Sequence, residues 1–441
     1  KMFPDYYNFF PETYCLPSER NHLSNVMEIG RKKGTVYIVK PDSGCQGKGI
    51  FLTKKIEDIP QGIGLVAQEY IDKPLLIDGL KFDLRVYVLI LSVSPLTIFI
   101  YKDGLARFAT EEYTPPTGKS LDSVCQHLTN YALNKLNPKF KFDPNDEQGT
   151  LGHKRGFESV WNYLRNRGDN PDIAWNGIKK LVKKTLCAIQ PLLKHMYLSC
   201  QSEDITGGMC FEILGFDVLI KDDLSPILLE VNHAPSFNTD TPLDNRVKGE
   251  LLRTAFNILD INFERRANIV ELGKQRFEER VKAGKRQKPN IPEREKKREE
   301  YMKDWMKRIE CKLGFFEKIM PLENEDEPYD QFCLHSEKML LSATGVDNKK
   351  KIEENQNINK PELNNRFIKE NKNNPKEIFN TLIDTIKTQK RQKSQKIYEM
   401  VNRLFRNNHY EKRNLTNNKK ENNVITSNTP LVQSIIRPKI V

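Results

Sequence analysis

The chain has 441 residues, of which 38% are hydrophobic, so it has room for two or three domains and a sizeable core in part of its length. No apolar run approaches the roughly 20 residues that a helix needs to cross a bilayer. The eight cysteines form neither a C-x-x-C pair nor a dense framework, which favours reduced thiols in a cytosolic protein. The formal net charge of +12 predicts an acidic partner, whether nucleic acid, an anionic membrane or an acidic protein surface.

The first distinctive element is a glycine-rich loop between two expected strands. Three glycines between residues 44 and 49 let backbone N–H groups approach a polyphosphate closely, and Lys40 and Lys48 supply positive charge. The pattern is not a P-loop, because no Ser or Thr follows Lys48, and not a dinucleotide fingerprint, because a strand follows instead of a helix. A flexible loop that joins two strands and closes over ATP is typical of ATP-grasp ligases. Taken alone, such a hairpin is as often an ordinary turn.

Apolar strands alternate with a few helices over roughly the first 260 residues. Short turns such as Ser94-Pro95 and Asp103-Gly104 link most of the strands. This is an α+β pattern with a largely antiparallel sheet. The expected strands are 35–40, 49–53, 65–71, 82–93, 96–101, 211–220 and 226–231, and apolar residues at helical spacing predict one long helix over 172–198.

Charged and apolar residues alternate from Lys81 to Arg85. A strand would therefore turn Lys81, Asp83 and Arg85 to one face. An ordinary strand with one wet face gives the same alternation. The order cation, anion, cation also suits a nucleotide site, in which the cations meet phosphates. Arg107 ends the next hairpin and could add positive charge beside it.

Oxygen donors converge on a later expected hairpin. Glu230 and Asn232 are two residues apart on one strand and share a face, while Val231 is expected to face the core, and Asp217 lies on the preceding strand. Three oxygen donors there suit Mg²⁺, which takes carboxylates together with substrate phosphates. Without a cation, both carboxylates would have to be exposed at strand ends. His233 is a poor ligand for Mg²⁺, so we expect it to contact substrate or to be structural.

The composition changes after about residue 262. Residues 264–308 hold 16 Lys and Arg against 9 Asp and Glu. An ordinary solvated helix often has many charges of both signs, but the positive excess here favours an acidic surface as partner. From about residue 343 the chain is rich in Asn and Lys, which predicts a disordered tail. Within the tail, 378–386 and 397–405 could be helices that form on binding.

Seven ordered blocks of the first 260 residues together resemble the tubulin tyrosine ligase-like family. Within that family, the stretches Ser43–Gly49 and Glu230–Phe237 are most similar to polyglutamylases that elongate glutamate chains and favour α-tubulin tails. The resemblance runs from about Phe9 to about Leu259. The blocks are Tyr37–Phe51, Gln68–Ile71, Lys81–Arg85, Ala106–Phe108, His127–Tyr131, Phe211–Val218 and Leu229–Asp240.

The resemblance implies an ATP-dependent ligase that adds glutamate to glutamate side chains of tubulin tails through an acyl phosphate. It implies an α+β, ATP-grasp-like core over 1–260, with antiparallel sheets and flanking helices that form the central and C-terminal lobes. Family members carry a further N-terminal lobe before the stretch seen here at Phe3–Pro11, and we expect it to be missing. Residues 261–322 would be a basic, helical, microtubule-binding extension and 323–441 the largely disordered tail.

The family also implies cofactors, partners and a location. The cofactors would be ATP and Mg²⁺, and the partners free L-glutamate and tubulin tails or microtubules, with no nucleic acid and no membrane. The protein would be a monomer in the cytoplasm and cytoskeleton, at a cilium, axoneme or basal body. The alternatives left open are a tubulin glycylase, a glutamylase of another acidic protein, and an inactive homologue that only binds microtubules.

Each matching position receives a role from the resemblance. Lys40, Arg85 and Glu230 would be catalytic, and Asp217, Glu230 and Asn232 would hold Mg²⁺. Residues that look like solvated surface by themselves would bind the incoming glutamate, namely Arg107, Tyr131, Lys154 and Lys248. Gln46 and His233 would touch the acceptor chain. The ATP site would comprise Lys40, Gln46, Gly47, Lys48, Gly49, Gln68, Glu69, Tyr70, Ile71, Lys81, Asp83, Thr129 and Asn130.

Overall fold

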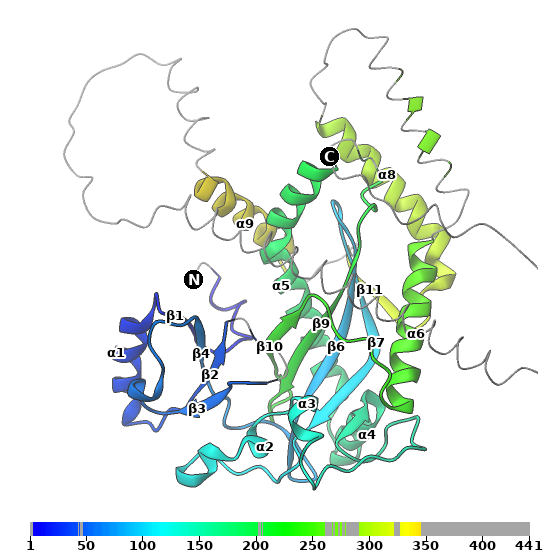
Figure 1. Ribbon diagram of the computed structural model, residues 1–441. Helices are drawn as coiled ribbons and strands as arrows, with labels where there is room; N and C mark the ends of the chain where they lie inside the picture. Colours follow the sequence, from blue (N-terminus) through cyan, green and yellow to red (C-terminus); the bar gives the residue numbers. More distant parts are fainter. Residues whose placement is uncertain are drawn as a thin grey trace, which may run out of the picture. The chain divides into compact units, whose positions relative to one another are not determined.

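A seven-stranded antiparallel sheet is the largest element of the protein, whose structure is a computed structural model (Figure 1). The described residues are 3–42, 44, 47–201, 204, 206–260, 267, 270–271, 274–275, 278, 291–321 and 327–344. The chain divides into two units, Lys1–Leu340 and Leu341–Val441, and apart from the end of the last helix the described residues all lie in the first. Gln46 and the pieces 378–386 and 397–405 lie outside the described residues.

The large sheet has five strands along its main path and two short strands beside it. The short strands are β5 (Leu76–Ile77), which pairs with β6, and β8 (Lys154–Gly156), which pairs with β7. Along the path the order is β10 (Pro226–Asn232), β9 (Glu212–Ile220), β6 (Leu80–Val93), β7 (Leu96–Phe108) and β11 (Phe316–Met320).

Helices cover both faces of this sheet. On one face lie α4 (Phe157–Arg167) and α5 (Pro171–Cys200), and on the other lie α6 (Pro242–Leu259) and α8 (Ile291–Ile309). Side chains alternate across a strand, so even-numbered residues of β6 such as Val86 enter the first core and odd-numbered ones such as Tyr87 the second. Both faces of β6 are therefore apolar from Val86 to Leu91, whereas the odd-numbered face is charged near the start of the strand. The expected helix over 172–198 is confirmed as α5.

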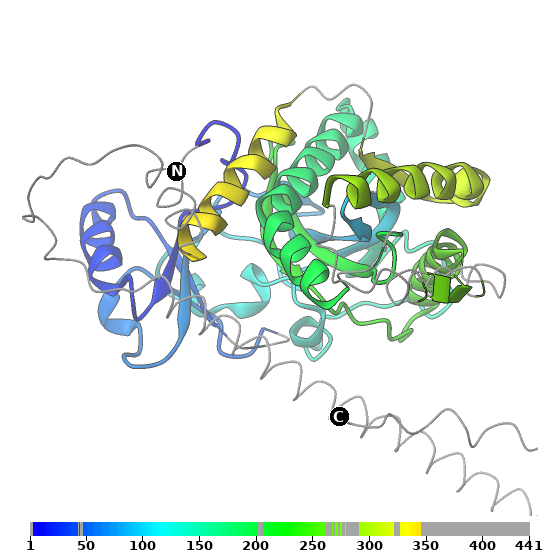
Figure 2. The same ribbon diagram turned by 90° about the horizontal axis from the view of Figure 1, so that it is seen from above.

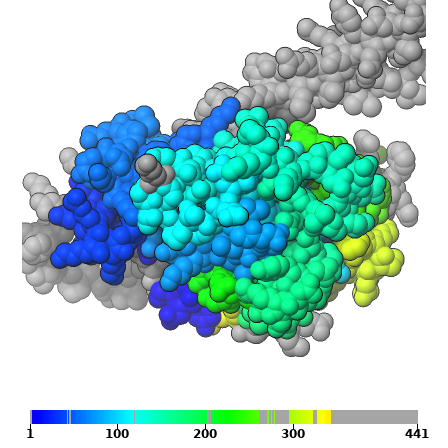
Figure 3. Space-filling model, turned by 90° about the horizontal axis from the view of Figure 1, so that it is seen from below, coloured from blue at the N-terminus to red at the C-terminus, as the bar shows by residue number. Residues whose placement is uncertain are grey.

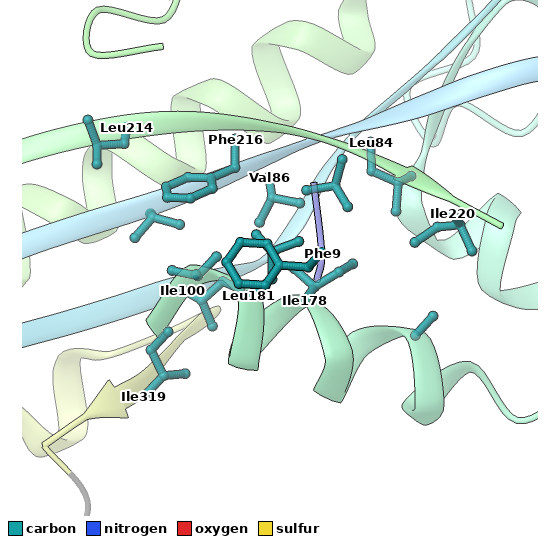
Figure 4. Packing of buried hydrophobic residues seen from close by; sticks show 14 of the residues in the cluster. Phe9, Leu84, Val86, Ile100, Ile178, Leu181, Leu214, Phe216, Ile220 and Ile319 are labelled. Carbon is teal, nitrogen blue, oxygen red and sulfur yellow. The ribbon is translucent and has the colours of Figure 1, made fainter. Parts of the chain in front are cut away.

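The segment before the first strand joins this core. Phe9 packs among Leu84, Ile178 and Leu181 (Figure 4), and its backbone oxygen accepts a 2.7 Å hydrogen bond from the backbone N–H of Leu228. The segment therefore lies against the edge strand β10. Helix α9 (Tyr329–Thr344) also packs into the first core and lies along α5 (Figure 2).

A smaller four-stranded antiparallel sheet lies beside the large one (Figure 1). Helix α1 (Arg20–Arg31) covers one of its faces with Leu23 and Met27. The strands run in the order β1 (Thr13–Leu16), β4 (Leu65–Glu69), β2 (Tyr37–Pro41) and β3 (Phe51–Thr53). The strands predicted from the sequence are thus all present, and their ends differ by at most two residues, except that β7 runs seven residues beyond its predicted end at 101.

The remaining elements are short. The segment between β7 and β8 lies, cyan in Figure 3, between the blue N-terminal region and the green helices that follow it. None of the helices in the described ranges is long and apolar enough to cross a membrane. The short elements are η1 (Ile56–Asp58), η2 (Gly118–Asp122), α2 (Val124–His127), α3 (Tyr131–Asn134) and η3 (Glu310–Lys312).

The predicted turn at Asp103-Gly104 is wrong, because β7 continues through it. Gly104 pairs with Val86 at a bulge, where the register between β6 and β7 shifts. A Cβ on Gly104 would lie 2.5 Å from the backbone oxygen of Arg85 and 2.4 Å from the ring of Phe157. Glycine is needed here for close packing and not for chain reversal.

The expectation that Val231 faces the core is also wrong, because its side chain is 39% exposed. Its strand, β10, is the edge strand of the large sheet, so Val231 has strand neighbours on one side only. The basic segment differs from a fully solvated helix as well. Trp305 of α8 is completely buried and donates a 3.0 Å hydrogen bond from Nε1 to the backbone oxygen of Ile258.

Candidate active site

A narrow cavity lies between the two sheets. It is lined from the small sheet by β2 and β4 and from the large sheet by β6, β7, β9 and β10. Most residues of the predicted ATP site line it, although they come from four separate stretches of the chain. These residues are Lys40, Gln68, Glu69, Tyr70, Ile71, Lys81, Asp83, Thr129 and Asn130, and Asp217, Glu230 and Arg107 join them.

A second, wider cavity of about 480 Å³ adjoins the first. Five residues line both cavities, and among them are Lys40 and Glu230. The volume falls in the range of about 300–1,000 Å³ usual for small-molecule sites. All four residues predicted to bind the incoming glutamate line this second cavity, namely Arg107, Tyr131, Lys154 and Lys248, together with Gly47, Lys48, Arg85, Lys135, Asn232 and Asp240.

Two predicted residues lie elsewhere. Gly49 belongs to the glycine-rich hairpin but lines neither cavity. His233 lines a third, apolar groove that shares Ala234 and Pro235 with the second cavity. The remaining predicted contact, Gln46, falls outside the described residues.

Buried carboxylates and guanidinium groups alternate across the wall between the cavities. Arg107 stands opposite Asp83 on β6, and its Nε and Nη2 bind the two Asp83 oxygens at 2.7 and 2.6 Å. Its Nη2 also lies 2.8 Å from Oδ2 of Asp217 on β9. Arg85 in turn stands opposite Asp217 and donates to it at 2.5 and 3.0 Å. The register of three neighbouring strands therefore builds one continuous ion-pair chain.

The pKa values follow from this chain of charges. Burial by itself would raise the pKa of Asp217, but Arg107 and Arg85 outweigh burial and hold that pKa well below its usual range. Burial by itself would lower the pKa of Arg107, but the carboxylates of Asp217 and Asp83 outweigh burial and raise that pKa. Both groups are therefore charged at neutral pH.

Glu230 comes next to Asp217 because of a bulge in β10. The register shifts between Leu228, which faces Val218, and Glu230, which faces Asp217. Without the extra residue, Glu230 would stand opposite Phe216, whose side chain lies in the core. Burial and the nearby Asp217 carboxylate raise the pKa of Glu230, and Lys40 partly offsets them. Burial lowers the pKa of Lys40, with Glu230 and Asp217 opposing the shift.

The predicted magnesium ligands converge at the same point. Nδ2 of Asn232 lies 3.2 Å from Oε1 of Glu230 and 3.4 Å from Oδ2 of Asp217. The buried carboxylate of Asp217 lies beside the more exposed carboxylate of Glu230, whose pKa is raised. This pair fits a divalent cation, and half a turn of the Asn232 amide would present its oxygen. Among the described residues there is no group of three or more His, Cys, Asp and Glu side chains that could hold a metal ion.

A buried polar cluster closes the far end of the narrow cavity. Nζ of Lys81 donates a 2.8 Å hydrogen bond to the Tyr70 hydroxyl, which lies 3.0 Å from Nδ1 of His127. Burial lowers the pKa of Lys81 to about 7, although Asp83 opposes the shift. At the other end, Nζ of Lys40 donates to Oε1 of Gln68 at 3.1 Å. These contacts orient the two lysines that line the cavity.

A charged residue that lines neither cavity, but contacts two lysines of the second, was not predicted from the sequence. Asp244 is completely buried and forms ion pairs with Lys154 and Lys248. The only local signal is Thr241 followed three residues later by an acid, which predicts the start of a helix. Thr241 is indeed the N-cap of α6, and its side chain accepts from the backbone N–H of Asp244. Nothing local indicates the lysine partner from β8.

The sequence model of the Tubulin-tyrosine ligase family matches residues 1–268. A "Probable beta-tubulin polyglutamylase" of Tetrahymena thermophila is 42% identical over 361 residues, which cover 80% of this chain and 30% of that protein. The human "Tubulin polyglutamylase TTLL13" is 42% identical over 76% of this chain and 41% of its own length.

The mouse "Tubulin polyglutamylase TTLL7" is more distant, at 40% identity over 62% of this chain and 30% of its own length. The chain spans less than half the length of these curated relatives. The family match covers more than half of the chain, and it includes the small sheet, all strands of the large sheet except β11, and both cavities.

Proposed function

The chain belongs to the tubulin-tyrosine ligase family, and we propose that it is an ATP-dependent ligase that adds glutamate to glutamate side chains on the C-terminal tails of tubulin. The names of its relatives, which are tubulin polyglutamylases, support this assignment. One structural observation carries it: an acidic and basic cavity between two sheets opens into a second, cation-lined cavity, and Lys40 and Glu230 line both.

In this proposal the narrow cavity takes ATP. Tyr70 and Ile71 follow β4 and would border the adenine, while Lys81 and Asp83 complete the site from β6. Lys40, Lys48 and Arg85 would meet the phosphates, because each lines the second cavity close to Glu230. Asp217, Glu230 and Asn232 would hold Mg²⁺, which neutralises phosphate charge when bound. The fold of the two sheets would then correspond to the central and C-terminal lobes of an ATP-grasp core.

The chemistry requires an activated carboxyl group, because oxide is too poor a leaving group for direct amide formation. The γ-phosphoryl group of ATP would pass to a carboxylate oxygen of the acceptor glutamate, and ADP would leave. The amine of free glutamate would then attack the carbonyl carbon, lose a proton and displace inorganic phosphate. Phosphoryl transfer depends mainly on positioning and on charge neutralisation, which Lys40 and Arg85 would supply from the protein.

The second cavity would hold the free glutamate. Arg107, Lys154 and Lys248 place cationic groups in its wall, and the ring of Tyr131 lies 4.2 Å from Nζ of Lys154. Carboxylates of the amino acid would pair with these cations. The acceptor chain would approach past His233 and the glycine-rich loop.

The reaction type within the family is also a proposal. The two stretches Ser43–Gly49 and Glu230–Phe237 favour elongation of glutamate chains on α-tubulin. A β-tubulin substrate is the second candidate, because the Tetrahymena relative is named for β-tubulin. We also propose that the protein acts on microtubules, in a cilium, axoneme or basal body.

Mass spectrometry of modified microtubules tests the proposal. Full-length protein is incubated with microtubules, Mg-ATP, glutamate and glycine, and tryptic tails are sequenced. We expect glutamate branches that require ATP and that lie on α-tubulin. Glycine branches would favour a glycylase, and no incorporation with intact microtubule binding would favour an inactive homologue.

A single amide substitution tests the site. Glu230→Gln should abolish incorporation and leave microtubule binding unchanged, whereas Glu158→Gln, the same change on the exposed face of α4, should preserve activity. Incorporation that persists in Glu230→Gln would contradict the role proposed for Glu230.

Residues 261–322 are proposed to be a basic extension that binds the acidic microtubule surface. Most of 261–290 lies outside the described residues, and α8 carries the exposed basic residues Lys297, Lys303 and Lys307. Attraction between exposed charges is screened by salt over about 8–10 Å. Co-sedimentation with microtubules should therefore weaken steeply as ionic strength rises, and an unchanged affinity would contradict this role.

A further inference from the structure

Asp244 lies at the start of α6 and is completely buried. Its two carboxylate oxygens bind two lysines from different elements. Oδ2 pairs with Nζ of Lys154 on β8, and Oδ1 lies 2.8 Å from Nζ of Lys248, one turn later on α6. One carboxylate therefore holds two ammonium groups side by side at the wall of the second cavity, which both lysines line.

A role in starting the helix does not account for this arrangement. Acidic residues are common in the first turn because they interact favourably with the helix dipole, but there they are usually exposed. The N-cap side chain, Thr241, accepts the backbone N–H of Asp244 at 3.1 Å and donates its hydroxyl to Oδ2 at 2.9 Å, but this capping does not require the two lysines. Asp172 at the start of α5 is the ordinary case, since it is exposed and Asn170 caps its N–H at 3.0 Å.

The charge balance of the cavity wall depends on Asp244. Burial lowers the pKa of Lys154, Asp244 opposes that shift, and Lys248 adds to it. The other groups that face Lys154 are the ring of Tyr131 at 4.2 Å and the carboxylate of Asp240. Without Asp244, two neighbouring ammonium groups would repel each other, and one of them would lose its proton more easily.

We propose that Asp244 is a positioning residue for the amino-acid substrate: it holds Lys154 and Lys248 next to each other, so that they bind a substrate carboxylate that Asp244 itself does not touch. This inference rests on the proposed function and adds to it a residue that sets the affinity for glutamate. Nζ of Lys248 also donates a 2.5 Å hydrogen bond to the backbone oxygen of Asn238, which fixes its direction.

The test is the KM for glutamate in Asp244→Asn, which keeps the size of the side chain and removes its charge. We expect that KM to rise at least tenfold, while the KM for ATP changes by less than twofold, because the ATP cavity does not include Asp244. The glutamate KM of the variant should also begin to rise at lower pH than that of the wild type, since Lys154 then deprotonates more easily. Asp172→Asn is the matched control and should leave both KM values unchanged.

A second readout and a second variant guard against misfolding. Glutamate binding is measured by calorimetry in the presence of a non-hydrolysable ATP analogue, and the melting temperature of each variant is recorded. If Asp244→Asn does not fold, Asp244→Ser replaces it, because serine is smaller and keeps an oxygen near the helix start.

The outcomes separate this inference from the proposed function. If the wild type neither incorporates nor binds glutamate, the proposed function fails and this inference fails with it. If the wild type uses glutamate but the Asp244 variant keeps its glutamate KM within twofold, only the inference is overturned. Equal rises in the KM for ATP and for glutamate, or a pH profile like that of the wild type, would also overturn it by indicating a general structural role.

Discussion

Asp83→Asn should destabilise the protein far more than a typical charge substitution. Asp83 is nearly buried and accepts hydrogen bonds from Arg107 at 2.6 and 2.7 Å and from the Thr129 hydroxyl at 2.7 Å. Asparagine keeps one acceptor, but it removes the charge and turns an N–H₂ group toward a guanidinium. Breaking a buried ion pair on one side costs about 3–5 kcal/mol. We expect the lower end, about 3 kcal/mol, because Arg107 keeps Asp217 at 2.8 Å.

Urea unfolding followed by fluorescence and by circular dichroism measures this loss, and coincident transitions justify a two-state free energy. A loss of that size corresponds to a melting temperature lower by roughly 6–12 °C for a domain of this size. Glu158→Gln is the control, because it breaks an exposed ion pair: the side chains of Arg165 and Glu158 are 51% and 69% exposed. That change should cost at most about 1 kcal/mol. Equal losses in the two variants would refute the idea that the buried ion-pair chain stabilises the sheet.

Three further predictions concern Lys81, Gly104 and α8. The pKa of Lys81 is lowered from 10.5 to about 7, so between these pH values the unfolded chain binds one more proton than the folded one. The contribution of this lysine to the free energy of unfolding should therefore rise as pH increases from 7 to 10.5. Lys81→Met should remove that rise in urea titrations at several pH values. Gly104→Ala should destabilise the protein by about 1–3 kcal/mol through overpacking. Gly249→Ala on α6 should be neutral or stabilising, because the atom nearest to the added Cβ is 3.9 Å away. Similar melting temperatures of the two variants would contradict the close packing of β7. Trp305→Ala should cost about 3–5 kcal/mol and lower the melting temperature of the whole core, and an unchanged transition would mean that α8 folds independently.

Local patterns predicted the elements well because they depend on nearest neighbours along the chain. The alternation of Lys81 to Arg85 indicated a strand, and β6 confirms it. The sequence also identified many residues that line the cavities. Local patterns indicated Lys40, Asp217 and Glu230, whereas Tyr131, Lys154 and Lys248 came only through the resemblance to a family. By themselves, Lys154 and Lys248 looked like solvated surface, since nothing near them in the sequence indicates burial.

Two details of the site depend on strand register, which no local pattern encodes. The bulge at Leu229 moves Glu230 from the core side to the side of Asp217, and a shift of one residue would have reversed this. The bulge near Gly104 lets β7 continue where the composition indicated a turn. Each bulge lies between strands that are consecutive in the chain, β9 with β10 and β6 with β7, but the alternation of residue types does not show where the extra residue falls.

The amino-acid sequence by itself determined which segments form strands and helices, since side-chain periodicity and backbone preferences act over a few residues. It also determined that one glycine-rich hairpin and one acidic hairpin carry the polar chemistry. The tertiary structure alone decided which charges neutralise one another. Arg107 reaches Asp217, and Asp244 reaches Lys154, only through the packing of elements that are distant in sequence. Burial then makes each pairing obligatory, because an isolated buried charge is too costly to keep.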